Sequence, residues 1–299
     1  MDSSPYLLGV ESQVLKLIED LKSDSADLQR RATGELRLLS RCSENRNVIA
    51  DCGVANLLVG LLHSSYPATR VNAVTVLLNL SIDDRNKISI ANANAIVSLI
   101  DVLRSADIPE AKENSAAALS SLAKIEENRV QIGESGAIGP LVELLANGTL
   151  RGKEDAVTAL YNLSKCRANM VRIAQSGAVA LLVSLIDRPS AAAGLVDKAV
   201  TILANLATTS EGRIAVGQDG ASALVNVVEL GSARGKENAA AALLQLCRSS
   251  SKYCRVVLQQ GSVPSLVALS HCGTPRAKQK ASSLLNYFQK QREAYAGRE

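Results

Sequence analysis

Aromatic residues are almost missing from this chain of 299 residues, which has no tryptophan, one phenylalanine and 2% aromatic residues in total. Hydrophobic residues nevertheless make up 47% of the sequence. A core must therefore be built from Leu, Val, Ile and Ala, whose side chains suit closely stacked helices. The lack of aromatic residues beside basic ones also argues against a nucleic-acid interface, which usually combines the two.

Charge of one sign is not in excess, since 33 Lys and Arg residues face 29 Asp and Glu residues, for a net charge of +4. No run of basic residues occurs, and we expect no nucleic-acid partner. The two histidines, His63 and His271, lie in distant parts of the chain, and no Ser or Cys near them completes a catalytic triad. The stretch GSARGKEN from Gly231 lacks the spacing of a phosphate-binding loop. The sequence predicts no catalytic residues and no cofactor.

Cysteine pairs of the C-x-x-C type are absent as well. The six cysteines are Cys42, Cys52, Cys166, Cys247, Cys254 and Cys272. None has a histidine in a zinc-binding spacing, so we expect no metal and interpret the thiols as small buried side chains in a reducing compartment. The first ten residues lack the features of a signal peptide, and no apolar run reaches the ~18 residues of a membrane span. We expect a soluble monomer without membrane insertion, located in the cytoplasm, with the nucleus and the membrane periphery as further locations.

What the sequence does contain is a repeat. Runs led by a small residue, such as AVTVLLNLS and AVTALYNLS, begin at Ala32, Ala73, Ser115, Ala156, Ala199, Ala239 and Ala281. The period is about 42 residues, within the range of helical solenoids, so the sequence predicts seven stacked units. In each run the apolar residues follow helical spacing, as Ala73, Val76, Leu77 and Leu80 do.

A turn residue keeps the same period. It is Gly53, Asn94, Gly136, Gly177, Gly220 or Gly261, always just before an apolar segment. Glycine and asparagine tolerate a positive φ, which predicts a sharp turn between a short first helix and a second helix. Eight residues before the turn, Asn45, Asn86, Asn128 or Asn169 is predicted to cap the first helix at its N-terminus. Pro67, Pro109 and Pro275 are predicted to begin the longer third helices.

These elements predict one uninterrupted array over residues 11–292. The first unit begins near Glu11 and lacks the short helix, and its charged face suits a solvent-facing cap. Residues 1–10 are predicted to be a disordered or linker lead, and residues 293–299 a flexible tail.

The units resemble the armadillo repeat, with three helices in about 42 residues. Longer strings resemble the armadillo domain of plant U-box ubiquitin ligases more specifically: IEENRVQIGESGAIGPLVELLANGT from Ile125, GKEDAVTALYNLS from Gly152, VDKAVTILANLAT from Val196 and GSARGKENAAAALLQLC from Gly231. The resemblance implies an all-α, right-handed superhelical solenoid with a concave groove for protein partners. It also implies that partners are ubiquitination substrates or regulators such as receptor kinases.

A U-box, which in this family recruits the ubiquitin-conjugating enzyme, is absent from the chain. By itself the chain should therefore not be an enzyme. We expect either the substrate-recognition part of a longer ligase or a stand-alone armadillo adaptor in signalling without a ubiquitin-ligase role.

The resemblance also assigns a groove along the third helices. In the family an Asn of the third helix pairs with the backbone of a bound peptide, and a side-chain amide suits this role because it both donates and accepts. Here that position and the position one turn earlier place ten residues in the groove: Thr75, Asn79, Ala117, Ser121, Thr158, Asn162, Thr201, Asn205, Ala241 and Gln245. The alternative is that each Asn bonds only a neighbouring turn. Nuclear-import adaptors carry Trp at the earlier position, so recognition of nuclear-localisation peptides is not expected.

A row of acidic residues lies two turns before the Asn position, at Glu113, Glu154, Asp197 and Glu237. One carboxylate in each repeat could form an acidic lane for a basic partner. The alternative is that each carboxylate favours the positive end of its own helix dipole.

Overall fold

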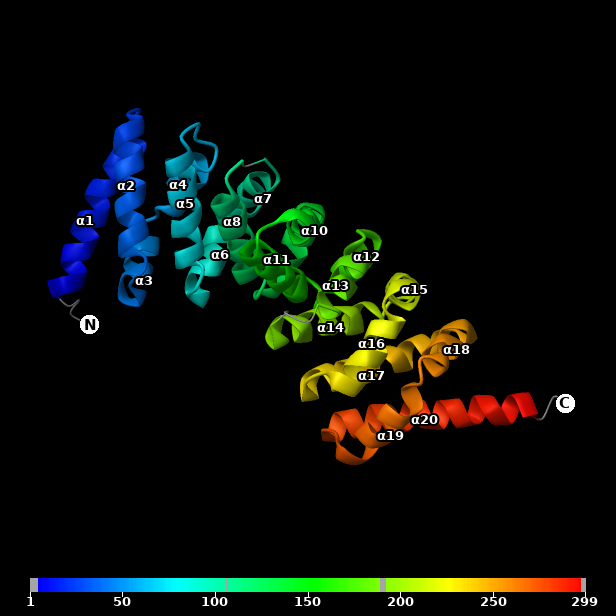
Figure 1. The fold of residues 1–299 in the computed structure, drawn as a ribbon. Helices are drawn as coiled ribbons and strands as arrows, with labels where there is room; N and C mark the ends of the chain where they lie inside the picture. The colour runs from blue at the N-terminus through cyan, green and yellow to red at the C-terminus, as the bar shows by residue number, and fades with distance from the viewer. Residues whose placement is uncertain (1–4, 106, 189–191, 297–299) are drawn as a thin grey trace. The chain divides into compact units, whose positions relative to one another are not determined.

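The computed structural model describes residues 5–105, 107–188 and 192–296, and within these ranges it contains twenty α-helices and no strand (Figure 1). The all-α prediction is confirmed. The chain divides into two compact units, Met1–Leu163 and Ser164–Glu299, which are described separately below. The sequence period continues across the division, between the repeats led by Ala156 and Ala199.

The first unit holds the cap and three full repeats. The cap consists of α1 (Pro5–Lys22) and α2 (Ala26–Leu39). The repeats are α3 (Ser43–Asp51), α4 (Ala55–Leu61) and α5 (Pro67–Leu80); α6 (Asp84–Asn92), α7 (Ala95–Ser105) and α8 (Pro109–Leu122); α9 (Glu126–Glu134), α10 (Ile138–Asn147) and α11 (Leu150–Leu163). The third helices α2, α5, α8 and α11 pack side by side in chain order.

The second unit holds three more repeats. They are α12 (Arg167–Gln175), α13 (Ala178–Ile186) and α14 (Ala193–Leu206); α15 (Ser210–Asp219), α16 (Ala221–Leu230) and α17 (Ala233–Ser249); α18 (Ser251–Gln259), α19 (Ser262–Cys272) and α20 (Pro275–Ala296). Here α14 packs against α17, and α17 against α20. The predicted order of a short helix, a second helix and a long third helix is confirmed in every full repeat.

The third helices carry the core because their apolar residues recur at helical spacing. In α5, Ala73, Val76, Leu77 and Leu80 are completely buried, as predicted. Pro67 occupies the first turn of α5, where its missing N–H breaks no helical hydrogen bond. Burying one leucine side chain contributes roughly 1.5–3 kcal/mol, so each stripe of this kind holds its repeat against the neighbouring one.

The predicted positive-φ turn is confirmed at five of its six positions. The value is 60° at Asn94 and between 70° and 83° at Gly53, Gly136, Gly177 and Gly261. Gly220 differs, with a φ of −107°. There an added Cβ would lie 3.0 Å from the carbonyl oxygen of Val216, so the tight packing, and not the handedness of the backbone, favours glycine at this position.

The Asn residues predicted to be N-caps have another role. The N-cap positions of α3, α6 and α9 are held by Cys42, Asp83 and Ile125. Asn45, Asn86 and Asn128 lie inside the short helices, and each donates from Nδ2 to the last carbonyl of the preceding third helix, at 3.1, 3.1 and 3.3 Å. The N-cap prediction is therefore wrong, since these amides satisfy a helix C-terminus instead.

Two predicted boundaries are also corrected. Helix α1 begins at Pro5, so residues 5–10 are helical and not a disordered lead. Helix α20 continues to Ala296, so residues 293–296 are helical and not a flexible tail. A helix gains one hydrogen bond for each added residue once it has begun, which favours such extensions. The rest of both predicted segments, residues 1–4 and 297–299, lies outside the described residues.

No single helix in the described part of the chain is long and apolar enough to cross a membrane. Two pairs of consecutive helices, α6–α7 and α12–α13, reach the necessary length and apolar composition only when both helices are counted, and each pair is sharply bent.

Candidate functional site

The predicted groove residues share the exposed stripe of their third helices. On α5 the stripe comprises Asn72, Thr75 and Asn79, which are half-buried beside the fully buried core positions. Ala117 and Ser121 on α8, and Ala241 and Gln245 on α17, are half-buried in the same way. Each unit therefore presents a face of small polar side chains along its third helices.

The Asn amides on this face are tied to the preceding repeat. Asn79 Nδ2 donates to Ser40 Oγ at 3.0 Å, and Asn205 Nδ2 donates to Ser164 Oγ at the same distance. Asn162, which is only 5% exposed, donates to the backbone oxygen of Ser120 at 3.0 Å. In the free chain these amides thus serve the structural role that the sequence left open, and contact with a partner stays a prediction.

The acceptor side of two amides is free for a partner. The side-chain oxygens of Asn79 and Asn205 accept no hydrogen bond from the described part of the chain, and both residues are half-buried. A carbonyl oxygen of this kind can accept from a backbone N–H or from a cationic side chain. The face can therefore bind groups that donate hydrogen bonds.

The threonines one turn earlier are also engaged within the fold. Thr75, Thr158 and Thr201 donate to the carbonyl four residues before them, at 2.7, 2.8 and 2.6 Å. Thr75 accepts from Asn114 Nδ2 of the next third helix, and Thr201 accepts from Asn238 in the same way, both at 2.9 Å. Thr75 and Thr201 thus each link two neighbouring repeats.

The structure does not support the acidic lane as predicted. Glu113 is only 7% exposed and accepts a hydrogen bond from Thr149 Oγ1. Asp197 accepts from Ser232 Oγ, and Glu237 accepts from Thr274 Oγ1, both at 2.6 Å.

Each of those hydroxyls also caps the next third helix. Thr149, Ser232 and Thr274 accept from a backbone N–H three residues later in the chain, at 2.9–3.1 Å. A carboxylate of one repeat therefore orients the cap of the next, and only Glu154 is exposed. The signal was present in the sequence, because a Ser or Thr follows each of these carboxylates by 35–37 residues.

Sequence reasoning missed an arginine on the face of the first unit. Arg37 on α2 donates to Asn72 Oδ1 at 3.2 Å and to Glu110 Oε1 at 2.8 Å, and so links three consecutive third helices. Arg151 donates to Asn114 Oδ1 at 2.6 Å. Both guanidinium groups donate to acceptor oxygens on the face, so these oxygens are already hydrogen-bonded within the chain.

Among the described residues, no group of three or more His, Cys, Asp or Glu side chains could hold a metal ion. Cys247 and Cys254 are buried, and desolvation raises the pKa of both thiols. The prediction of buried cysteines is confirmed only for these two: Cys42, Cys52 and Cys166 are half-buried, and Cys272 is exposed.

Comparison with known families gives a match over nearly the whole chain. The family described as the plant U-box protein ARM repeat region matches residues 13–295. The chain is 62% identical over 294 residues to U-box domain-containing protein 4 and 55% identical over 288 residues to U-box domain-containing protein 2, both of Arabidopsis thaliana. These matches include 98% and 96% of this chain, but only 35% and 40% of the length of the two relatives.

Solved structures agree on the fold. An engineered protein matches 92% of this chain, and the match covers 67% of the engineered protein, with a TM-score of 0.79 and 24% identity. A designed armadillo repeat protein matches 78% of this chain and 99% of its own, with a TM-score of 0.68 and 24% identity. At this level of identity the likeness shows the armadillo fold alone.

Proposed function

We propose that this chain, which belongs to the plant U-box protein ARM repeat region family, binds partner proteins through the faces of its third helices. The observation that carries the proposal is the half-buried stripe of Thr, Ala, Asn and Gln on these helices, with unpaired side-chain oxygens at Asn79 and Asn205. Repeat arrays use extended surfaces of this kind to bind other polypeptides.

A solved relative supports a polypeptide as the bound species. A designed armadillo repeat protein, 22% identical with a TM-score of 0.66, was solved in complex with the peptide (KR)4. Cationic side chains of a guest would find acceptors at the Asn oxygens here. The chain's own arginines, Arg37 and Arg151, would make its preference for a basic guest weaker.

The finer proposal is that the bound partners are ubiquitination substrates or their regulators, among them receptor kinases. It is supported by relatives that are U-box proteins and extend well beyond the matched region. In this proposal the chain recognises the substrate and a U-box recruits the conjugating enzyme. We expect the protein in the cytoplasm, with the nucleus and the membrane periphery as further locations.

Blocking the face tests the binding role. Ala117→Arg and Ala241→Arg place a long cation on the third-helix face of each unit, where neither alanine side chain makes a hydrogen bond. Ala180→Arg on the exposed side of α13 is the matched control. Affinity for a purified partner should fall about tenfold or more for the two face variants, a loss of about 1.4 kcal/mol, and stay unchanged for the control. Equal affinity for all three variants would refute the face as the binding site.

The ubiquitin role needs a separate test. The chain alone, incubated with activating and conjugating enzymes, should not transfer ubiquitin. The natural protein that contains this region should ubiquitinate the bound partner, and the face variants should abolish that transfer. Retained binding without transfer by the natural protein would favour a stand-alone adaptor.

A further inference from the structure

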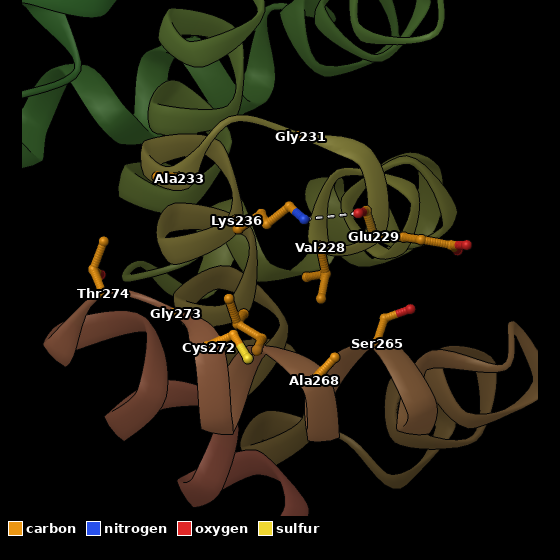
Figure 2. A pocket seen from close by; sticks show the side chains of 11 residues that line it. Val228, Glu229, Gly231, Ala233, Lys236, Ser265, Ala268, Cys272, Gly273 and Thr274 are labelled. Carbon is orange, nitrogen blue, oxygen red and sulfur yellow. Dashed lines mark hydrogen bonds between the residues drawn. The ribbon is translucent and has the colours of Figure 1, made fainter.

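A hollow in the second unit lies away from the third-helix face. It measures about 670 Å³ and lies in the second unit, between the end of α16, the start of α17 and helix α19 (Figure 2). Val228 and Leu269 form its buried apolar wall, while Lys236 and Cys272 lie at its edge. The volume is within the 300–1,000 Å³ that small ligands and inserted side chains occupy in proteins.

The first unit has the same hollow in a smaller form. It measures about 280 Å³ and lies between α7, α8 and α10. Leu103, Lys112, Leu144, Gly148 and Thr149 line it at the register positions of Val228, Lys236, Leu269, Gly273 and Thr274. The hollow is therefore a property of the repeat, and what differs between the two copies is the set of side chains that fill it.

The second unit has smaller side chains at the other positions. Gly231, Ala233, Ser265, Ala268 and Cys272 replace Asp107, Pro109, Pro140, Glu143 and Asn147. With these replacements the hollow measures about 670 Å³ instead of about 280 Å³, and the carboxylates of Asp107 and Glu143 are lost from its lining, while Glu229 lines only the larger hollow. Both changes make the larger hollow more favourable for an apolar group that carries a negative charge.

Lys236 is placed to receive that charge. Its Nζ donates to the backbone oxygen of Glu229 at 2.8 Å, while the Glu229 carboxylate points away from the lysine (Figure 2). An ammonium group has three donors, so two remain for an incoming anion. This hydrogen bond also restricts the lysine side chain, which lowers the entropy cost of binding.

We propose that this hollow, named here the α16–α19 pocket and defined by the residues above, docks a segment of a partner polypeptide. The segment inserts a branched apolar side chain between Val228 and Leu269 and pairs an adjacent carboxylate with Lys236. The surface extends further than a small molecule needs, because Gly231 also lines a neighbouring hollow of about 390 Å³ whose rim is Leu230, a side chain that is 82% exposed. This site is independent of the third-helix face.

Disulfide capture at Cys272 tests the α16–α19 pocket directly, because this exposed thiol lines the pocket. The probe is N-(3-mercaptopropionyl)leucine, supplied as its mixed disulfide with 2-mercaptoethanol. The Cys272 thiolate attacks the probe sulfur, a protein–probe disulfide forms, and 2-mercaptoethanol leaves. The fraction captured at Cys272 is measured by peptide mass mapping over a series of 2-mercaptoethanol concentrations.

Two comparisons carry the result. At Cys272, reducing the disulfide with the leucine probe should require about tenfold more 2-mercaptoethanol than reducing the disulfide with the matching glycine probe. The leucine probe should also require about tenfold more 2-mercaptoethanol at Cys272 than at an Asn147→Cys variant, the matched position of the smaller hollow. Lys236→Gln should abolish the preference for the leucine probe over its leucinamide analogue. Ala268→Glu, which restores the residue of the first unit, should reduce capture while melting stays unchanged.

Equal capture at Cys272 and at the Asn147→Cys variant would overturn the proposal. It would also be overturned if neither Lys236→Gln nor Ala268→Glu changed the capture at Cys272. Free N-acetylleucine should not compete well, because a polypeptide segment also contacts Leu230. Saturation by micromolar N-acetylleucine would assign the pocket to a free small acid and would equally overturn it.

Discussion

The two units secure the end of a third helix in different ways at the same register position. In the first unit Asn128 donates from its amide to the last carbonyl of α8, at Leu122, and also to the backbone of Lys87, both at 3.3 Å. In the second unit Gly212 occupies that position, and Thr209 donates instead to the last carbonyl of α14, at Leu206, at 2.9 Å.

This difference shows that the repeat preserves a hydrogen bond and not a residue. The Thr209 hydroxyl reaches the carbonyl from the N-cap of α15, and it also accepts from the Gly212 backbone N–H at 3.1 Å. The short helix then lies so close to α14 that a side chain at Gly212 has no room. The same space that one repeat fills with an amide is closed in the other by approach of the backbone.

The largest effect is expected where the backbones approach. In Gly212→Ala the new Cβ would lie 1.9 Å from the Leu206 carbonyl oxygen, so the backbone must move. We expect a loss of about 3 kcal/mol of unfolding free energy, in the range of overpacked core substitutions. Urea denaturation followed by circular dichroism measures it.

Gly139→Ala is the control, because a Cβ there meets nothing within 4 Å in helix α10. Alanine favours a helix over glycine, so this variant should be neutral or more stable by up to about 1 kcal/mol. A Gly212→Ala variant as stable as the control would mean that the close approach in the second unit does not exist.

The amide of the first unit should come next. Asn128→Ala removes two buried hydrogen bonds, to the carbonyls of Leu122 and Lys87, which should cost about 2 kcal/mol. Asn147→Ala, on the exposed surface of the same unit, should change stability by less than about 0.5 kcal/mol. If the two variants unfold at the same urea concentration, the Asn128 amide does not secure the helix end.

The carboxylate–cap pairs sharpen the comparison further. Glu113 is buried and Glu237 is half-buried, so Glu113→Ala should cost about 2 kcal/mol and Glu237→Ala about 1 kcal/mol. Hydrogen exchange should show the loss locally, at the start of α11 for the first variant and of α20 for the second. Loss of protection spread evenly over the unit would contradict the cap mechanism.

The smallest effect depends on pH. Lys87, whose side chain is completely buried, donates to Asp84 Oδ1 at 2.6 Å, and this hydrogen bond lowers the pKa of the Asp84 carboxyl group. A lowered pKa stabilises the fold above the ordinary carboxyl pKa, and this stability is lost as pH falls through the lowered value. Melting temperatures of the wild type and Asp84→Asn should therefore differ slightly at neutral pH and converge in acid. A difference that persists in acid would exclude the linkage.

The repeat, the helix order and most turns could be predicted from the sequence because they depend on local patterns. Spacing of apolar residues defines the third helices, and a residue that tolerates positive φ marks the turn, as at Asn94. Gly220 shows the limit of this reasoning, because glycine serves handedness and close approach equally well and the sequence does not distinguish them.

The side-chain network of the face was not predictable in the same way. Whether Asn79 faces a guest or Ser40 depends on how one repeat is rotated against the next, which no local pattern specifies. The buried position of Glu113 depends on the same rotation. Asn162 is buried, so its substitution would destabilise the protein, whereas the half-buried Asn205 leaves more of its amide accessible to a partner.

Site-specific photo-crosslinking tests binding at the third-helix faces most directly. A benzoylphenylalanine replaces Ala117 or Ala241 on the faces of the two units, or the 55% exposed Ile88 or Ile214 elsewhere on the same units. Each protein is irradiated with the purified partner, and the cross-linked peptides are identified by mass spectrometry. The account predicts cross-links at Ala117 and Ala241 and none at Ile88 or Ile214; cross-links confined to the two isoleucine positions would contradict it.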